Sequence, residues 1–457
     1  MSDWIPSLGQ KRGPIYLSIV KKLEADITSG IVTPGTRLLP LREMADRLKV
    51  SVGTISKAYT RAESNGLISV EVGRGTFVNE RNQTISNLRQ TSPISKNLAL
   101  NVPPATGEKK LISETLKAIA DDQSMGDLLS YLPHQGSRKH RDSICQWLSS
   151  QNMASDVGHI MITPGAQHAI DIAMRTVAKP GSTILTESMT YSGMMALAVQ
   201  SSYRLNGIQM DDKGIIPEAL DKAFAETDAR VLYCTPTIQT PTGVVMPEDR
   251  RREIATIIKR HDAFIIEDDA YAFLPEHALR PISAEIPERS FYIISFAKCL
   301  APGLRIGAMV IPPRFRDACA NAMRVTGWMA PPIMAEIVCR LIDNKELAEQ
   351  VRRKRLQANE RDTIARRVLE GWLPPKNKYP GFHVWLPLPT SRSPAALVSQ
   401  ASLAGITLSS PDTLNPLDPA HSGIRLCLGS IEQLVRLEST LVEVKSILEG
   451  SDSISVV

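Results

Sequence analysis

The chain is poor in aromatic residues, has no long apolar run and carries only scattered cysteines. Of its 457 residues, 5% are aromatic and six are cysteines. The cysteines form no C-x-x-C pair and no Cys/His spacing of a zinc site, so we expect reduced cysteines and no metal. No stretch approaches the roughly 18 apolar residues of a membrane-spanning helix. The first residues include an early acid and no apolar segment of a signal peptide. These absences favour a cytoplasmic protein with no membrane partner.

The length predicts two or three domains, because one domain usually takes about 100–200 residues. The formal net charge of +5 and the pI near 8.8 permit an acidic partner without demonstrating one. The position of the basic residues along the chain is therefore more informative than their number.

The stretch from Ser295 to Gly307 contains a lysine in an informative place. The apolar run before it, residues 291–294, is typical of a buried strand. Lys298 then lies just beyond the end of a strand, where open α/β sheets bind ligands. Next to Arg305, its amine would have a lowered pKa and form a Schiff base with an aldehyde cofactor, while Ser295 and Arg305 would hold a phosphate. A solvated loop lysine is the alternative if this motif stands alone.

Two further motifs precede this lysine. The apolar run 264–266 predicts another buried strand, and Asp268 follows it, so that its carboxylate can accept a hydrogen bond from a protonated pyridine nitrogen. Tyr271 is close enough in sequence to meet a ring hydroxyl. An acidic loop that faces water is the other interpretation. Further upstream, the backbone N–H groups of Gly165, Ala166 and Gln167 open a predicted helix and can face a phosphate.

In this order the motifs resemble those of the fold-type I pyridoxal 5'-phosphate (PLP) enzymes of the aspartate aminotransferase class. The resemblance runs from Tyr131 to Arg425 and implies that PLP is held as an internal aldimine on Lys298. The roles it implies for the other positions are these: Asp268 pairs with the pyridinium, Tyr271 with the ring hydroxyl, Tyr191 stacks on the ring, Ser295, Arg305, Gly165, Ala166 and Gln167 hold the phosphate, Arg425 binds a substrate carboxylate, and Tyr131 reaches the cofactor of a neighbouring subunit.

One position departs from that family. Where the family usually has Asn-Pro-x-Gly, this chain reads Thr240-Pro-Thr-Gly243. The hydroxyl of Thr240 can still donate a hydrogen bond to the ring hydroxyl, but its reach is shorter than that of an asparagine amide. We expect cofactor binding to survive this change better than fast turnover.

The first 80 residues follow a different pattern. Apolar residues at helical spacing predict a helix over 15–30, and two shorter helices are predicted over 41–48 and 51–66. Two alternating runs, 67–72 and 76–78, flank the Gly73-Arg74-Gly75 turn and predict a hairpin. Three helices and a hairpin are typical of a winged helix-turn-helix, whose third helix enters the major groove of double-stranded operator DNA.

This segment resembles the DNA-binding domain of GntR-type transcription regulators. The resemblance implies DNA contacts by Arg42, Lys57 and Arg74, with Ser51 and Thr54 as further candidates. Val52 departs from the arginine that is common at its position. Residues 1–80 carry eleven basic and eight acidic residues, too mild an excess for tight binding by charge alone, so we expect two copies of the chain to act together as a homodimer. A small helical domain that binds protein is the alternative.

We therefore predict a multidomain fold of mixed α+β and α/β class. Its parts are a winged helix-turn-helix over 10–79, a polar linker over 80–97 and a PLP-binding, aminotransferase-like domain over 98–450 with a smaller C-terminal subdomain. Strand-like runs alternate with helix-like stretches in the larger domain, which indicates a mostly parallel sheet. The basic stretch between residues 349 and 367 is interpreted as a solvated helix face.

The combination resembles the MocR family of bacterial regulators. It implies a transcription regulator that senses an amino compound, or PLP itself, through the aldimine at Lys298, with Arg425 binding an effector carboxylate. Two alternatives stay open. The first is an active aminotransferase with an accessory DNA-binding module, because the main catalytic positions other than Thr240 are present. The second is a constitutive DNA-binding protein whose large domain serves only dimerisation, which fits poorly with an intact Lys298 and Asp268.

Overall fold

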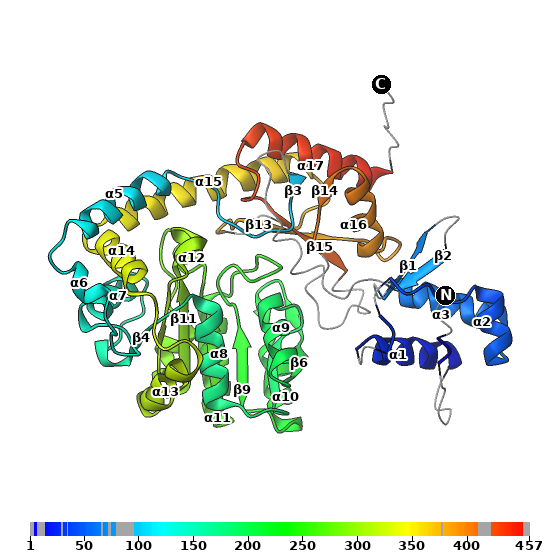
Figure 1. Ribbon diagram of the computed structural model, residues 1–457, viewed down its shortest axis with the longest axis horizontal. Helices are drawn as coiled ribbons and strands as arrows, with labels where there is room; N and C mark the ends of the chain where they lie inside the picture. Colours follow the sequence, from blue (N-terminus) through cyan, green and yellow to red (C-terminus); the bar gives the residue numbers. More distant parts are fainter. Residues whose placement is uncertain are drawn as a thin grey trace. The chain divides into compact units, whose positions relative to one another are not determined.

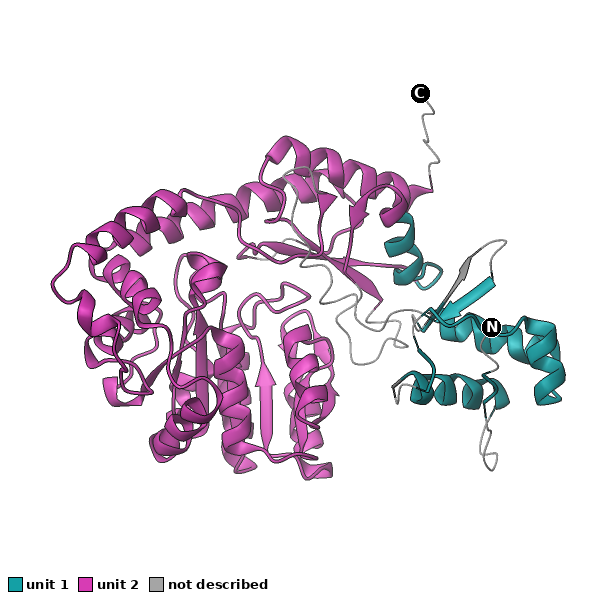
Figure 2. Ribbon diagram, viewed as in Figure 1, with its two compact units in different colours: residues 1–93, 390–400 teal, residues 94–389, 401–457 magenta. Residues whose placement is uncertain are grey.

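The chain forms two compact units (Figure 2). The computed structural model describes residues 4–6, 14–28, 31–33, 35–64, 67–71, 75–78, 96–375, 378–409 and 422–450. The smaller unit comprises residues 1–93 with 390–400, and the larger unit comprises residues 94–389 with 401–457. Arg74, the end of the third predicted helix at 65–66 and most of the predicted linker lie outside the described residues. The domain boundaries therefore stay a prediction.

The smaller unit contains the three predicted helices and the hairpin. The helices are α1 (Ile15–Thr28), α2 (Leu41–Leu48) and α3 (Val52–Ser64), and the strands β1 (Ile68–Glu71) and β2 (Gly75–Val78) pair antiparallel. Apolar residues spaced along each helix face one core, in which Ile19, Met44 and Ile55 are fully buried. The buried hydroxyl of Tyr59 on α3 donates a hydrogen bond over 2.8 Å to the backbone oxygen of Leu39, which fixes α3 against the chain that enters α2.

The larger unit is built on a seven-stranded sheet (Figure 1). In spatial order its strands are β4 (Ile160–Thr163), β12 (Gly307–Val310), β11 (Ser290–Ser295), β10 (Phe264–Asp268), β9 (Val231–Cys234), β5 (Thr183–Glu187) and β6 (Arg204–Ile208). Only β12 runs against its two neighbours, and the other adjacent pairs are parallel. Most residues of the central strands are buried, as continuous apolar runs covered on both faces require. The prediction of a mostly parallel sheet is confirmed.

Helices cover both faces of this sheet and bury separate apolar clusters against it. One cluster packs α8 and α13 against one face of the sheet. Another cluster packs α10 and α11 against strands β5, β9 and β10. The helices of this part are α5 (Glu108–Ala120), α6 (Met125–Leu128), α7 (Arg138–Ser150), α8 (Ala166–Val177), α9 (Ser192–Gln200), α10 (Pro217–Glu226), α11 (Glu248–Arg260), the short α12 (Phe296–Cys299) and α13 (Arg316–Thr326). The short strands β7 (Met210–Asp211) and β8 (Gly214–Ile215) form a small hairpin.

The C-terminal part of the larger unit has its own small sheets. Strands β13 (His383–Pro387) and β15 (Gly423–Cys427) pair antiparallel, and β3 (Lys96–Asn97) pairs parallel with β14 (Ile406–Thr407). The helices are α14 (Pro332–Asp343), α15 (Glu346–Val368) and α17 (Leu434–Glu449), and α16 (Pro394–Leu403) crosses the boundary between the two units. This arrangement agrees with the predicted smaller C-terminal subdomain.

The basic stretch of α15 is only partly a solvated face. Arg352 and Arg353 are exposed, as predicted, but Lys354 and Arg361 are buried. The guanidinium of Arg361 donates to three backbone oxygens, those of Leu428, Ile431 and Glu432, over 2.6–2.8 Å. The interpretation of this stretch as a solvated helix face was therefore wrong for these two residues: Arg361 holds the segment after β15, and Lys354 donates to the backbone oxygen of Pro104.

Five of the six cysteines are buried and Cys145 is half-buried, and all six are free thiols, in agreement with the expectation of reduced core residues. Among the described residues, no helix combines the length and the apolar character needed to cross a membrane.

Candidate functional site

Lys298 lies on the single turn of α12, directly after the end of β11. Ser295 caps this turn, because its Oγ accepts a hydrogen bond from the backbone N–H of Ala297 over 3.3 Å. The amine of Lys298 donates to the backbone oxygen of Asn101. Burial, with the nearby guanidinium groups of Arg425 and Arg305, lowers the pKa of Lys298 to about 8. A substantial neutral, nucleophilic fraction of this amine is therefore present near neutral pH.

Asp268 is the last residue of β10, which pairs directly with β11, the strand that Lys298 follows. Its Oδ2 accepts a hydrogen bond over 2.9 Å from the hydroxyl of Tyr233 on β9, and its buried Oδ1 has no hydrogen-bond partner among the described residues. Burial raises the pKa of Asp268 to about 6, while the bond from Tyr233 lowers it. A buried carboxylate oxygen without a donor is a place for a cationic N–H group.

The N-terminus of α8 and Arg305 lie together on the same side of the sheet. Gly165 precedes α8 with φ +83°, and a methyl group added there would lie 2.7 Å from Nη2 of Arg305. Gly307 on β12 is equally constrained, since a methyl group there would lie 2.8–2.9 Å from the backbone of Gly165 and Ala166. Only glycine allows this close approach. The close approach brings the first backbone N–H groups of α8 and the guanidinium of Arg305 around one position. These groups together suit the binding of a phosphate.

Tyr191 and Gln167 meet at Gly193, near the start of α9. A methyl group at Gly193 would overlap the ring of Tyr191 at 2.3 Å and the Oε1 of Gln167 at 2.5 Å. The side-chain amide of Gln167 donates to the backbone oxygen of Gly193 over 3.1 Å. The structure therefore brings the predicted stacking tyrosine and the predicted phosphate turn together.

Tyr271 and Arg425 lie close to a buried histidine that the sequence did not single out. The rings of Tyr271 and His383 are 5.8 Å apart between centroids. Burial lowers the pKa of His383 to about 3, and Arg425 and Lys298 lower it further. His383 is therefore neutral, and because its Nε2 lies 3.1 Å from the backbone oxygen of Gln239, that nitrogen carries the hydrogen. Burial also raises the pKa of Tyr271 well above its usual value.

The segment around Thr240, where the sequence differs from that of the family, is buried and has a hydrogen-bond network of its own. The side chain of Gln239 donates to the backbone oxygen of Met189 over 2.7 Å and accepts from the hydroxyl of Thr242 over 2.6 Å. The side chain of Gln239 therefore forms hydrogen bonds with neighbouring loop residues. It does not replace the asparagine amide that the family has at position 240. The N–H of Thr240 points to the hydroxyl of Thr235, 3.4 Å away.

Tyr131 is the predicted site residue that lies apart from the others. Tyr131 is 80% exposed, and its ring lies beside that of Trp328, with ring centroids 5.5 Å apart. Such exposure is unusual for a large aromatic ring and is consistent with the expected reach toward a neighbouring subunit. That reach stays a prediction.

The donor set fits PLP. A helix N-terminus with Arg305 suits its phosphate, the free oxygen of Asp268 suits its pyridinium nitrogen, and the amine of Lys298 suits its aldehyde. The pKa of Lys298 responds to Asp268, Arg305 and Arg425 at once, so the structure has gathered these charges around one amine.

Three residues of this site were missed by sequence reasoning. Tyr233, which donates to Asp268, had been assigned only to a strand, and its position at the carboxyl end of β9 was the available signal. Asn101, the acceptor for Lys298, and His383 come from segments far apart in the sequence. No local pattern marks either of them.

In the smaller unit, the predicted DNA contacts lie around α3. Arg42, Ser51 and Lys57 are exposed and Thr54 is half-buried. The Oγ of Ser51 accepts from the backbone N–H of Thr54 over 3.2 Å, as an N-cap does. Arg74 lies outside the described residues.

Arg37 is a further basic residue of the smaller unit that was not singled out. Its guanidinium lies so close to Gly75, at the start of β2, that a methyl group there would be 2.6 Å from its Nε. This places an exposed cation beside the hairpin.

Fold and site together define a helix-turn-helix unit joined to an aminotransferase-like unit. Residues 94–437 match the model of aminotransferase class I and II, and residues 15–78 match that of the bacterial regulatory proteins of the gntR family. The chain belongs to the aminotransferase class I and II family and carries a GntR-type helix-turn-helix at its N-terminal end.

Known relatives have both parts. The chain is 29% identical over 408 residues to the HTH-type transcriptional regulator YdeF of Bacillus subtilis (strain 168), with 88% of this chain and 87% of YdeF covered. It is 25% identical over 404 residues to the probable rhizopine catabolism regulatory protein MocR of Rhizobium meliloti, with 79% of each covered. A kynurenine aminotransferase of Pyrococcus horikoshii matches in structure with a TM-score of 0.70 and 25% identity, over 80% of this chain and 95% of that chain.

The predicted family, fold class and cofactor are thereby confirmed. The relatives named as regulators carry the same two parts, and the aminotransferase structure was determined with PMP, the amine form of PLP. The protein is a DNA-binding regulator with a PLP-type aminotransferase fold.

Proposed function

We propose that this protein regulates transcription by sensing an amino compound, or PLP itself, at Lys298, and that occupancy of this site changes how the helix-turn-helix binds operator DNA. One observation carries the proposal: a GntR-type unit shares its chain with a site in which the lysine amine, its lowered pKa and the aspartate for the ring nitrogen are all intact. A domain kept only for dimerisation has no need of a buried lysine opposite a buried aspartate.

When bound, PLP supplies an aldehyde that condenses with primary amines and a ring that withdraws electrons. The residues of this chain bind and orient it. The Oδ1 of Asp268 would accept the ring N–H, Tyr233 would keep that carboxylate in place, and Arg305 with the N–H groups of α8 would bind the phosphate. The neutral amine of Lys298 is the nucleophile, and its pKa near 8 makes it reactive at neutral pH.

An effector with a carboxylate would bind Arg425. Arg425 is 8% exposed, lies on β15, and acts on the pKa of both Lys298 and His383, so it is near the reacting amine. A buried guanidinium binds a carboxylate through two parallel hydrogen bonds. The effector can regulate only by binding one arrangement of the protein more tightly than the other.

We further propose a cytoplasmic homodimer. The basic excess of residues 1–80 is too small for one copy to bind DNA tightly by charge alone. Two helix-turn-helix units that bind one DNA together have a higher combined affinity. The exposed Tyr131 supports a partner subunit at this face of the larger unit.

The second candidate function is an active aminotransferase. The residues that bind and activate the cofactor are in place, and the position that departs is Thr240. A threonine in place of an asparagine amide alters the donor to the ring hydroxyl, so we expect at most slow transamination.

Purified protein separates these functions. We expect PLP to give a visible absorption band and, after borohydride, a stable mass gain, both lost in Lys298→Ala and kept in Lys259→Ala, an exposed lysine on α11. An electrophoretic shift with DNA flanking the protein's own gene should change when an amino compound is added. Steady turnover of amino and keto acids with no effect on DNA binding would favour the enzyme, and absence of the band would remove the sensing function.

A further inference from the structure

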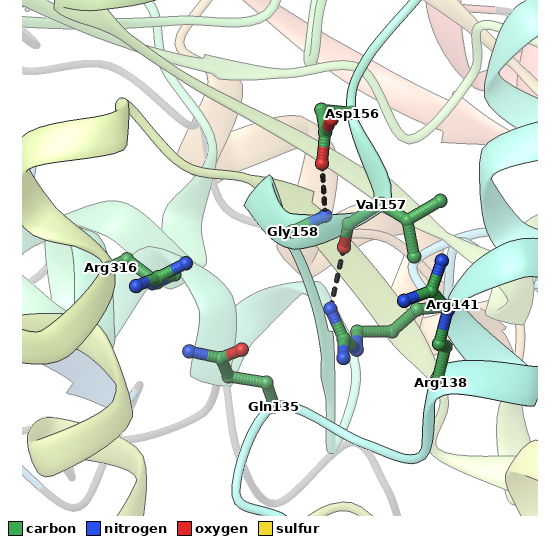
Figure 3. A pocket seen from close by; sticks show the side chains of 7 residues that line it. All are labelled: Gln135, Arg138, Arg141, Asp156, Val157, Gly158 and Arg316. Atoms are coloured by element: carbon green, nitrogen blue, oxygen red, sulfur yellow. Dashed lines mark hydrogen bonds between the residues drawn. The ribbon is translucent and has the colours of Figure 1, made fainter.

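A second polar cavity lies in the larger unit, away from the residues gathered around Lys298. It has a volume of about 240 Å³ and is lined by Gln135, Arg138, Arg141, Asp156, Val157, Gly158 and Arg316. Figure 3 shows the guanidinium of Arg316 on one side of this space and those of Arg138 and Arg141 on the other. Three arginines around one cavity give it a positive potential, which favours the binding of an anion.

Strand directions separate this cavity from the cofactor site. The cofactor residues follow the carboxyl end of β4, at Gly165, whereas Val157 and Gly158 precede its amino end. Strand β12 runs the other way, so Gly307 at its start faces α8 while Arg316 comes after its end. The two sites therefore lie at opposite ends of the same pair of strands.

The wall of the cavity is anchored by backbone contacts. Arg141 donates through Nη1 to the oxygen of Val157 over 2.6 Å and through Nε to the oxygen of Gly136 over 3.3 Å. The backbone oxygen of Gln135 accepts from the N–H of Ile162 on β4 over 3.0 Å. Among the described residues Nη2 of Arg141 has no hydrogen bond, so this group stays available to a ligand while the rest of the guanidinium is held.

The acids nearby do not neutralise these arginines. Asp156 lines the cavity, but its Oδ1 accepts from the N–H of Gly158 over 2.6 Å. Arg138 and Asp142 approach only to 3.9 Å, and Arg316 and Asp317 only to 3.7 Å, at exposed positions where such pairs are weak. Three arginines and one aspartate leave two positive charges on the wall.

Helix direction adds to this positive potential. Arg138 is the first residue of α7, whose first turn has no acidic residue, and Arg316 is the first residue of α13. Helix N-termini are themselves positive, so cations are unfavourable there and an anion is favourable. Burial lowers the pKa of Arg141, Asp142 and Asp156 act against this, and the repulsion from Arg138 and Arg316 adds to it.

We infer that Arg138, Arg141 and Arg316 form a second anion-binding site for a phosphate dianion, free or as a phosphomonoester. A dianion matches the two uncompensated charges, whereas a carboxylate leaves one of them. Arginine forks bind phosphate oxygens in pairs, and the amide of Gln135 adds a neutral donor. The cavity volume accommodates a phosphate with a small substituent.

The test uses full-length protein that has been loaded with PLP and treated with borohydride, so that the cofactor's own phosphate site is filled. Inorganic phosphate is titrated calorimetrically at pH 8 and constant ionic strength. We expect saturable binding that weakens about ten-fold or more in the double variant Arg138→Gln/Arg316→Gln. Arg324→Gln, an exposed arginine on the same helix α13, is the matched control and should bind like the wild type. Arg141 is left intact because it holds backbone oxygens.

Further arms decide the ligand class. Glycerol phosphate should bind as well as phosphate if esters are accepted, and its failure would restrict the site to the free anion. Acetate that binds as tightly as phosphate would overturn the inference, as would phosphate binding that is absent or unchanged in the double variant. Unchanged phosphate binding together with weaker operator binding would assign these arginines to the DNA backbone instead. Matching thermal unfolding of wild type and variants excludes misfolding as the cause.

Discussion

The hydroxyl of Tyr233 on β9 donates to Oδ2 of Asp268 on β10 over 2.9 Å, inside the sheet of the larger unit. This bond stabilises the ionised carboxylate and opposes the effect of burial, which raises the pKa of Asp268 to about 6 even with the bond in place. Removing it in Tyr233→Phe should weaken PLP binding about ten-fold, because a hydrogen bond to a charged group contributes about 1.5–3 kcal/mol. Absorbance titration with PLP measures this.

A matched control exists one strand away. The hydroxyl of Tyr292 donates to Oδ2 of Asp269 over 3.0 Å and is equally buried. Tyr292→Phe should therefore destabilise the fold to a similar degree without weakening PLP binding to the same extent. Equal losses of PLP affinity in both variants would show that Asp268 has no special role.

The rate at which the protein captures PLP should depend on pH with a midpoint near 8. Only the neutral amine of Lys298 attacks an aldehyde, and burial lowers its pKa to about 8. Below that pH, each unit of increase should raise the rate about ten-fold, and above it the rate should level off. Stopped-flow absorbance from pH 6 to pH 10 follows this. A rate that keeps rising to pH 10 would indicate an ordinary, solvated lysine.

Arg425→Gln should abolish the response to carboxylate-bearing effectors while leaving the PLP absorption band. The lost paired hydrogen bonds correspond to about 1.5–3 kcal/mol, or a ten- to hundred-fold loss of effector affinity. Effector titrations monitored by the change in the band measure this. A response to amines that lack a carboxylate should persist, and loss of the band itself would mean that Arg425 supports the cofactor.

Substitutions in the smaller unit should weaken operator binding through lost phosphate or base contacts. Lys57→Ala and Arg42→Ala remove exposed cations on α3 and α2. We expect losses of about 1–3 kcal/mol for a contact to a base and less for one to phosphate, with the salt dependence reduced by about one unit in the latter case. Lys21→Ala, exposed on α1, is the control. Unchanged binding in both variants would contradict the assignment of α3 to the groove.

Arg361→Met should destabilise the larger unit by about 3–5 kcal/mol. The side chain is 1% exposed and satisfies three backbone oxygens, which a methionine would leave buried without a donor. Arg353→Met, exposed on the same helix, should have little effect. Urea unfolding followed by tryptophan fluorescence compares the two, and equal stabilities would refute a clamping role for Arg361.

Arg361 also illustrates what could not be predicted from the sequence alone. Strand and helix periodicity predicted the three helices and hairpin of the smaller unit and the mostly parallel sheet of the larger one, because apolar spacing reports local burial. The run of charges on α15 predicted a solvated helix face. Burial of Arg361 depends on backbone oxygens from residues 428–432, about 70 positions later, and no local pattern carries that information.

The same limit applied to the site. Lys298, Asp268, Gly165 and Arg305 were predicted from motifs at strand ends, where the fold itself collects ligand-binding groups. Tyr233 was overlooked because a tyrosine in a strand is ordinary for a core. His383 and Asn101 reach the site through tertiary packing of distant segments.

The hydrogen bond from the Lys298 amine to the backbone oxygen of Asn101 connects the reactive nitrogen to the segment with which the larger unit begins. Among the contacts that hold this segment are the hydrogen bond from the N–H of Cys427 to the oxygen of Leu98 and the short pairing of β3 with β14. An amine that has joined an aldehyde no longer donates to Asn101 in the same way. We therefore expect cofactor binding at Lys298 to change the contacts of Asn101 and of the neighbouring residues 96–100.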